Sequence, residues 1–163
     1  MAFSFQVTGM EELLRQMDQL PQKAAGVATE ALYEGAGVVA DSVSRAVQGI
    51  ATEPFKYAKG GRKRKASPEE KAILINAKKG VAKFRKTGVS VQTSVGMQNS
   101  GYAVLNGKTK PIPLIANSIN SGTSFMTRQP FFRSGVNSGK TKAMQAMKDS
   151  IEQDWRDRLI NHN

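Results

Sequence analysis

Cysteine is absent from this chain of 163 residues, which therefore has no disulfide, no thiolate metal site and no thiol nucleophile. The single histidine, His162, is next to last, where a frayed terminal residue is a better interpretation than a ligand or a base. No apolar run is long enough to cross a membrane, and the first residues lack the basic start and apolar stretch of an export signal. We expect neither a membrane span nor export.

Acidic residues are few, with 13 Asp and Glu against 24 Lys and Arg. They stand in small groups, such as Glu11-Glu12 and Asp154 with Asp157, that suit helix ends or solvent-facing positions. A carboxylate pair formed in space stays open, because such partners need not be neighbours in sequence. No pattern of a nucleophile with its base is present, so we expect no catalytic residues, no cofactor and no metal.

The positive charge is concentrated between Lys56 and Lys86. This stretch holds twelve cations against two acids, Glu69 and Glu70, and accounts for +10 of the chain's +11. A localised cationic segment on a neutral body indicates an anionic partner, most often a phosphate backbone. Charge runs are often only solvated loops, but so strong a bias favours a binding surface. The residues predicted to bind DNA or a partner are Arg62, Lys63, Arg64, Lys65, Lys78, Lys79, Lys83, Arg85 and Lys86.

Aromatic residues near this stretch, Phe55, Tyr57 and Phe84, are candidates for stacking on bases, although scattered rings are more often local core contacts. No helix-turn-helix or zinc-finger pattern is present, so we expect any nucleic-acid binding to be independent of sequence.

The first fifty residues predict a strand followed by helices. Phe3 to Val7 alternates apolar and polar residues, and Thr8 is placed to cap a helix that carries Leu13 to Leu20. Pro21 is expected to start a longer helix with one apolar stripe of mostly small residues from Ala24 to Ile50. Such a stripe packs within the subunit or against a neighbour, and we favour the intramolecular face.

Within the basic stretch, Ser67-Pro68-Glu69-Glu70 predicts a helix start, with a capping serine and a glutamate three residues later. That helix should carry Ile73, Leu74 and Ala77 on one face and stop near Gly80. Val89 to Val95 alternates as a strand, with residues 101–105 as its expected hairpin partner. Pro111 to Pro113 indicates a loop, and residues 114–119 suit either a strand or a helical turn.

The end of the chain predicts an amphipathic helix whose buried residues are Met144, Met147, Ile151, Trp155 and Leu159. Just before it, residues 135–141 read Gly-Val-Asn-Ser-Gly-Lys-Thr, close to the phosphate-binding loop of nucleotide hydrolases. The spacing is one residue short, with Ser134 where the first glycine belongs. A glycine-containing turn into the last helix is therefore the preferred interpretation, and a hydrolase using Lys140 is the least favoured function.

Two stretches resemble the neck and tail-completion proteins of long-tailed phages, the group that includes lambda-like minor tail protein Z. Residues 5–13, Phe-Gln-Val-Thr-Gly-Met-Glu-Glu-Leu, match the family's opening stretch. The second stretch, before the last helix, matches at Gly122, Thr123, Ser124, Pro130, Phe131 and Arg133. Asn120 stands where the family usually has a glutamate, which leaves any role of that acid in doubt.

The resemblance implies an α+β fold with a long N-terminal helix and a C-terminal amphipathic helix packed on a small antiparallel sheet. The chain would be one domain, residues 1–163, with residues 51–87 as an enlarged basic loop that contains a short helix. The resemblance also implies a structural protein of the virion and not an enzyme.

In the virion, this protein would form a homo-oligomeric ring at the head–tail junction, in contact with neck, connector and tail proteins and with DNA in the channel. It would reside in the host cytoplasm during assembly. We expect Pro130, Phe131 and Phe132 to form an oligomer interface, with one phenylalanine in the core and the other against a neighbour. The alternative is a sequence-independent nucleic-acid-binding protein, and the neighbouring genes would discriminate between the two.

Overall fold

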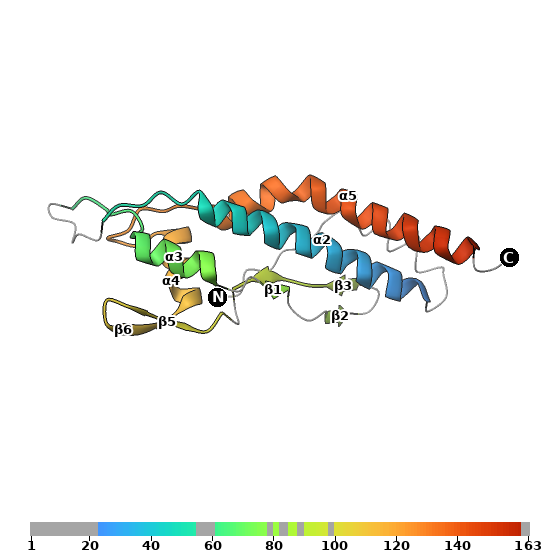
Figure 1. Cartoon of the computed structure of the whole chain (residues 1–163), viewed down its shortest axis with the longest axis horizontal. Coiled ribbons are helices and arrows are strands. Elements are labelled where there is room, and N and C mark those ends of the chain that lie inside the picture. Colours follow the sequence, from blue (N-terminus) through green and yellow to red (C-terminus); the bar gives the residue numbers. More distant parts are fainter. Residues whose placement is uncertain are drawn as a thin grey trace.

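Two long antiparallel helices form the body of the molecule (Figure 1). The computed structural model describes residues 23–54, 61–77, 80–81, 85–87, 90–97 and 100–160. Helix α2, Lys23–Gln48, runs back along helix α5, Phe131–Ile160, for most of its length. With 30 residues, α5 is about 45 Å long. The pair therefore gives the molecule an elongated shape.

Small residues let the two helices approach closely. The buried side chains of α2 include Ala31, Leu32, Ala36, Val39, Val43 and Val47. Opposite them, Gly135 and Gly139 of α5 leave no room for a side chain. A Cβ added at Gly135 would lie 2.6 Å from the Val43 Cα, and one added at Gly139 would lie 2.7 Å from the Ser42 Oγ. Gly35 of α2 likewise faces the Met147 side chain. The predicted apolar stripe of α2 is therefore an intramolecular core face.

Smaller elements lie along one side of the helix pair (Figure 1). They are helices α3, Pro68–Asn76, and α4, Ile112–Ser121, and six short strands. The strands are β1 Gly80–Val81, β2 Arg85–Thr87, β3 Ser90–Gln92, β4 Val95–Gly96, β5 Tyr102–Leu105 and β6 Lys108–Pro111. Helices α3 and α4 and strands β5 and β6 lie near one end of the helix pair, and β1, β2 and β3 lie beside the middle of α2. The strands form three antiparallel pairs, β1 with β4, β2 with β3 and β5 with β6. The α+β class is confirmed, although the long helices pack mainly on each other.

The predicted partner of residues 101–105 is wrong. Strand β5 pairs with β6, with Tyr102 opposite Pro111 and Leu105 opposite Lys108. Asn106 and Gly107 connect them with φ of 51° and 71°, the left-handed values of a tight two-residue hairpin turn. Pro111 ends β6 and caps α4 instead of marking a loop, and residues 114–119 are helical.

Helix α3 begins as predicted and ends earlier. Ser67 is its N-cap, Pro68 follows, and the capping box with Glu70 is complete. Leu74 and Ala77 are buried and Ile73 is partly buried, as expected of the predicted face. The helix stops at Asn76, because Ala77 takes an extended backbone conformation with ψ of 136°.

The predicted buried face of the last helix is largely wrong. Met147 is buried, but Met144 and Trp155 expose 41% and 47% of their surface, and Ile151 is only partly buried. The buried row of α5 is instead Phe131, Gly135, Gly139, Ala143 and Met147. A row of every fourth residue turns about 40° per step around a helix, so the next residue of the row, Ile151, packs against the core only in part.

Several predictions fall outside the described residues. These are the strand and helix of residues 3–20 with their phage-like opening stretch, the start of the long helix at Pro21, Phe55, Tyr57, Phe84, Val89 and His162. Lys78, Lys79 and Lys83 also lie outside them. Arg85 and Lys86 are placed by their backbone, in β2. Across the described part of the chain, no helix combines the length and apolar character needed to cross a membrane.

Candidate interaction surface at the cationic end

Residues 62–65, which we call the basic run, and the adjoining Ala66 lie between two other segments of the chain, one near Thr52 and one near Met126. On one side, Thr52 and Ala66 form a parallel bridge, and the Glu53 amide donates to the Ala66 carbonyl over 2.9 Å. On the other side, Arg64 bridges Met126. The Arg64 amide donates to the Phe125 carbonyl over 2.9 Å, and the Thr127 amide donates to the Arg64 carbonyl over 2.8 Å. The backbone of residues 64–66 is therefore fixed.

Arg64 anchors the basic run to helix α3. Its guanidinium donates two hydrogen bonds to the Glu70 carboxylate, Nη1 to Oε2 over 2.8 Å and Nη2 to Oε1 over 2.7 Å. Both residues are buried, at 8% and 3% exposure. Glu70 Oε2 also accepts from the Ser67 amide over 2.7 Å, and the Glu70 amide donates to the Ser67 hydroxyl. One carboxylate thus closes a capping box and neutralises a buried cation.

This arrangement sets the charge state of Glu70. Burial alone raises the pKa of a carboxyl group, because it disfavours the ionised form. At Glu70 the hydrogen bonds and positive charge of Arg64, together with the hydrogen bonds of Ser67, outweigh burial and hold the pKa below its ordinary value of 4.5. Glu70 is therefore ionised at neutral pH.

Arg64 must be removed from the predicted binding residues, because its guanidinium is buried against Glu70. Its neighbours Arg62, Lys63 and Lys65 are exposed. Arg128 is exposed too and lies next to Thr127, whose hydroxyl donates to the Lys63 carbonyl over 3.5 Å. We call Arg62, Lys63, Lys65 and Arg128 the cationic surface. Through the Arg64–Glu70 pair, the helix that begins after Ser67 braces this run.

Residues 122–130 join α4 to α5, and we call this segment the connector. It carries Arg128 and most of the second stretch that resembles the phage family. Gly122 has φ of 75°, and an added Cβ would lie 3.0 Å from the Arg128 backbone nitrogen, so any other residue would be strained there. The Thr123 hydroxyl accepts from the Met126 amide over 3.0 Å. Gln129 bonds both backbone groups of Ala51, its Oε1 accepting over 2.8 Å and its Nε2 donating over 2.9 Å. The connector therefore joins the end of α2 to the start of α5.

Asn120 supports the first turn of α5. Its side-chain oxygen accepts from the Phe132 amide over 3.1 Å, and the residue is 9% exposed. That amide is one of the donors that a helix start leaves without a partner inside the helix. Asparagine offers a side-chain oxygen acceptor for this amide, as glutamate also would.

Of the predicted interface residues Pro130, Phe131 and Phe132, Phe131 is the phenylalanine that lies in the core. Its side chain is 6% exposed in the core cluster, and Phe132 is partly buried against the same cluster. The two phenylalanines begin a helix instead of an extended segment, so neighbouring side chains point about 100° apart and both reach the core. Pro130 is exposed.

The hydrolase-like residues 135–141 form continuous helix within α5 and no phosphate loop. Gly135 and Gly139 pack against α2, so they are there for close helix contact and not for a turn. Nor do three metal-ligating side chains come together anywhere in the described part of the chain.

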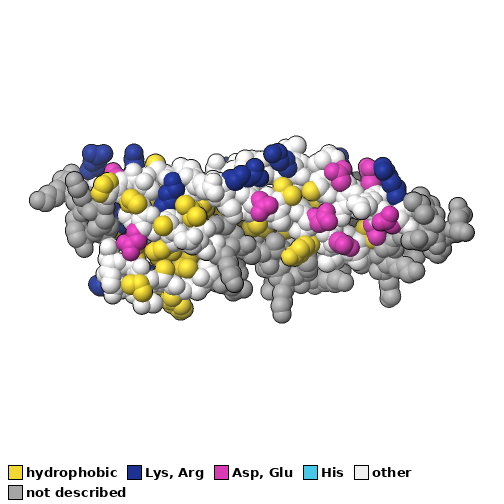
Figure 2. Space-filling model, in the orientation of Figure 1, with side chains coloured by type: hydrophobic (Ala, Val, Ile, Leu, Met, Phe, Trp, Pro, Cys, Tyr) yellow, Lys and Arg dark blue, Asp and Glu magenta, His cyan; other side chains and the backbone are white. Residues whose placement is uncertain are grey.

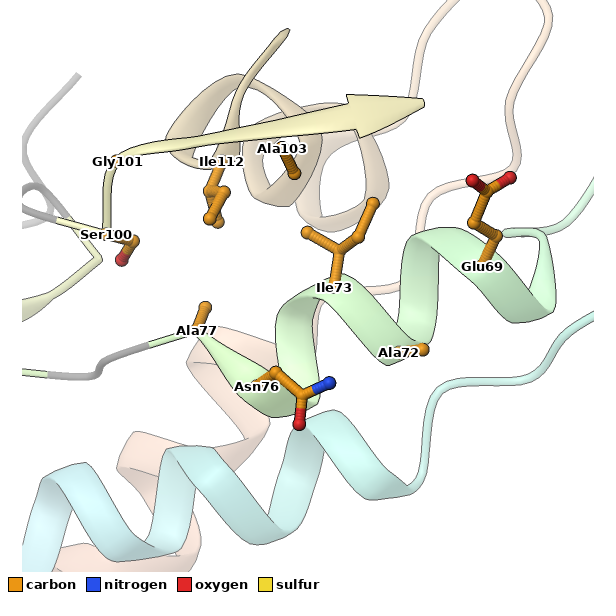
Figure 3. Close-up of a pocket in the computed structure, with 9 residues that line it drawn as sticks. All are labelled: Glu69, Ala72, Ile73, Asn76, Ala77, Ser100, Gly101, Ala103 and Ile112. Atoms are coloured by element: carbon orange, nitrogen blue, oxygen red, sulfur yellow. The ribbon is translucent and has the colours of Figure 1, made fainter. Parts of the chain in front are cut away.

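A groove of about 560 Å³ separates α3 from β5 (Figure 3). Ile73 of α3, and Ala77 just after that helix, face Ala103 and Ile112 across it. Its polar lining residues, Glu69, Asn76 and Ser100, lie at the periphery. The groove is suited to an apolar side chain rather than to acid–base chemistry.

Charge is segregated along the molecule. None of residues 71–148 is Asp or Glu. In the described part, acids stand mainly on the first half of α2 and on α5 from Asp149 onward, which lie side by side at the end opposite the cationic surface. Figure 2 shows most of the visible acidic side chains over that half and Lys and Arg toward the other end.

Sequence reasoning missed Arg128, Gln129 and the β5–β6 hairpin. The Asn106-Gly107 pair between alternating segments was a sufficient signal for the hairpin. No comparable local signal pointed to Gln129, whose partner Ala51 is 78 positions away.

Comparison of the chain with protein-family models, curated proteins and solved structures finds no match.

Proposed function

We propose that this chain is a structural protein of a long-tailed phage, a neck or tail-completion protein that assembles as a homo-oligomeric ring at the head–tail junction. One observation carries the proposal. The residues shared with that family, Gly122, Thr123 and Pro130 among them, form the connector that is hydrogen-bonded directly to the basic run. The phage-like stretch and the most cationic part of the chain are thus one continuous surface.

The cationic surface gives this protein a means to meet DNA in the channel. Arg62, Lys63, Lys65 and Arg128 are exposed at one end of an elongated body, next to the hydrogen-bonded backbone of residues 64–66. A ring of such ends presents a positive band to a phosphate backbone without reading its sequence. The remaining contacts of the ring are with neck, connector and tail proteins.

The test is electron microscopy of phage particles assembled with and without the gene. Without the protein we expect filled heads and tails that fail to join, and supplying it in trans restores joined particles. Normal numbers of joined, infectious particles in its absence would refute the proposal. A gene position among capsid, connector and tail genes is the supporting observation that is easiest to obtain.

The second candidate is a sequence-independent nucleic-acid-binding protein that acts outside a virion. The same exposed cations favour it, since they need only a phosphate backbone as partner. It predicts tight, salt-sensitive DNA binding by the free protein and no effect of gene loss on particle joining. The particle experiment therefore separates the two functions.

A further inference from the structure

An exposed aromatic ring lies beside the cationic surface. Phe125 belongs to the connector and exposes 55% of its surface. Its carbonyl accepts from the Arg64 amide over 2.9 Å, which holds its backbone against the basic run. A single exposed apolar residue needs no explanation by itself. The neighbours of Phe125 are what give this ring a functional meaning.

The backbone pairing places the Phe125 side chain on the same face as two lysines. Arg64 and Met126 are partners in a parallel bridge, and both side chains are buried, at 8% and 2% exposure. Successive side chains of an extended segment point to opposite faces. Lys63 and Lys65 therefore point away from the core, and so does Phe125 on the neighbouring segment. All three residues are exposed, as this alternation requires.

The charged residue directly beside Phe125 is a cation. The register that pairs Arg64 with Met126 sets Lys63 next to Phe125. An acid, Glu53, is also bonded to this part of the chain, its Oε1 accepting from the Lys65 amide over 2.6 Å. Glu53 belongs to the segment on the other side of the basic run, so the basic run separates its backbone from that of Phe125.

A ring beside lysines is suited to a nucleotide whose base is unpaired. Phosphate oxygens supply the negative charge that Lys63 and Lys65 attract, and the face of an unpaired base stacks on an exposed ring. An acidic protein surface would satisfy the lysines but leave the ring without a partner. In a duplex the bases are already paired and stacked, so the ring gains a base only if one is extruded, which costs free energy.

We propose that the cationic surface and Phe125 together bind single-stranded DNA, with an unpaired base stacked on the Phe125 ring and the adjoining phosphates on Lys63 and Lys65. The inference rests on the proposed function in one respect, that DNA is the partner of the cationic surface. It adds that the DNA is bound at an unpaired stretch or end and not by its duplex backbone alone. Every base has an aromatic face, so such binding carries little sequence preference.

The test compares Phe125→Leu with the wild type on two probes, a labelled oligonucleotide of mixed sequence and the duplex of the same sequence. Leucine keeps an apolar side chain without an aromatic face, so affinity for the single strand should fall about tenfold, while affinity for the duplex should change less than about twofold. Phe125→Tyr keeps the ring and should bind like the wild type. Tyr102→Leu is the matched control, because Tyr102 is 72% exposed on the β5–β6 hairpin, outside the cationic surface.

Salt dependence separates the ring from the lysines. Stacking releases no counterions, so Phe125→Leu should lower single-strand affinity by the same factor at every salt concentration. Lys63→Gln with Lys65→Gln should instead reduce the slope of log affinity against log salt by roughly 0.7 for each lost contact, the value for single strands. Lys140→Gln with Lys142→Gln, at exposed positions of α5, is the control of equal charge and should leave the slope unchanged. Circular dichroism checks that all variants fold.

Several results would overturn the site. They are a wild type with no affinity for the single strand, a Phe125→Leu variant that keeps full single-strand affinity, and a Phe125→Leu variant that loses affinity equally for both probes. A Phe125→Leu variant that keeps its DNA affinity but loses self-association in sedimentation velocity would also overturn it, because the ring would then contact a second copy.

The outcome for this site is separable from that for the function. If Phe125→Leu loses single-strand affinity but particles join normally without the gene, the site exists and the proposed function is wrong. If gene loss prevents joining but Phe125→Leu keeps its affinity for the single strand, the function stands and this site is wrong.

Discussion

Gly135 of α5 lies against Val43 of α2 so closely that a Cβ at position 135 would be 2.6 Å from the Val43 Cα. Close approach at this point holds the two long helices together, and Gly139 repeats it one turn later against Ser42. The helix pair in turn fixes the position of the connector and of the cationic surface, because the connector runs directly into α5.

Gly135→Ala should lower the free energy of unfolding by about 1–3 kcal/mol, because backbone must move to accept the methyl group. Chemical denaturation measures it. Gly37→Ala is the matched control, a mid-helix glycine with open space around it, and should raise stability by about 0.5–1 kcal/mol through helix propensity. Equal stabilisation by both substitutions would contradict the close packing.

Glu70→Gln should destabilise the protein by about 3–5 kcal/mol, because it leaves the Arg64 guanidinium buried without a counter-charge. Glu69→Gln, at the exposed neighbouring position, should change stability by no more than about 0.5 kcal/mol. Similar effects of the two substitutions in denaturant unfolding would show that the buried pair does not anchor the basic run.

Stability should depend on the ionisation of Glu70. Its pKa is lower in the folded chain than the ordinary 4.5, so the unfolded state binds more protons between the two values. The stabilisation is complete above pH 4.5 and is lost as the pH falls through the folded-state pKa. The unfolding free energy of the wild type, minus that of Glu70→Gln, should therefore shrink below pH 4.5. A difference that stays constant would exclude this cause.

Met147 and Trp155 should respond in opposite ways to truncation. Met147→Ala empties a buried position between the helices and should cost about 2–5 kcal/mol. Trp155, 47% exposed, should be quenched readily by acrylamide in the dissociated subunit, and Trp155→Ala should cost less than about 1 kcal/mol. A Trp155 protected from quencher in the monomer would mean that α5 buries a different face.

Replacing Arg62, Lys63 and Lys65 by glutamine should weaken DNA binding and make it less sensitive to salt. Each lost phosphate contact reduces the slope of log affinity against log salt by roughly 0.9. Lys140, Lys142 and Lys148, exposed on α5, provide a control triple substitution of equal charge. If both triples change the slope equally, only net charge matters, and if neither does, the run is a solvated outer feature.

Local patterns predicted the elements whose stability is local. The capping box of Ser67 and Glu70 appeared where the sequence placed it, and the small-residue stripe of α2 is the core face. The last helix shows the limit. Its sequence offers a large apolar row from Met144 to Leu159, but the packed row contains Gly135 and Gly139 because α2 comes too close for side chains. Glycines of this kind look like turns until the partner helix is known.

The position of the cationic surface was predictable from the sequence, but the residues that belong to it were not. The run from Arg62 to Lys65 reads as four equal cations, yet Arg64 is removed from the surface by a carboxylate six residues away. Arg128 joins the surface through a bridge between segments that lie 62 residues apart, Arg64 and Met126. Such a pairing depends on the tertiary fold, which no local pattern encodes.

Reconstruction of phage particles that carry this protein by electron cryo-microscopy tests the central claim most directly. The account predicts a closed ring of copies at the head–tail junction, with Arg62, Lys63, Lys65 and Arg128 facing the channel or a negatively charged partner. Particles that contain the protein only as isolated single copies, or joined particles that lack it, would contradict the account.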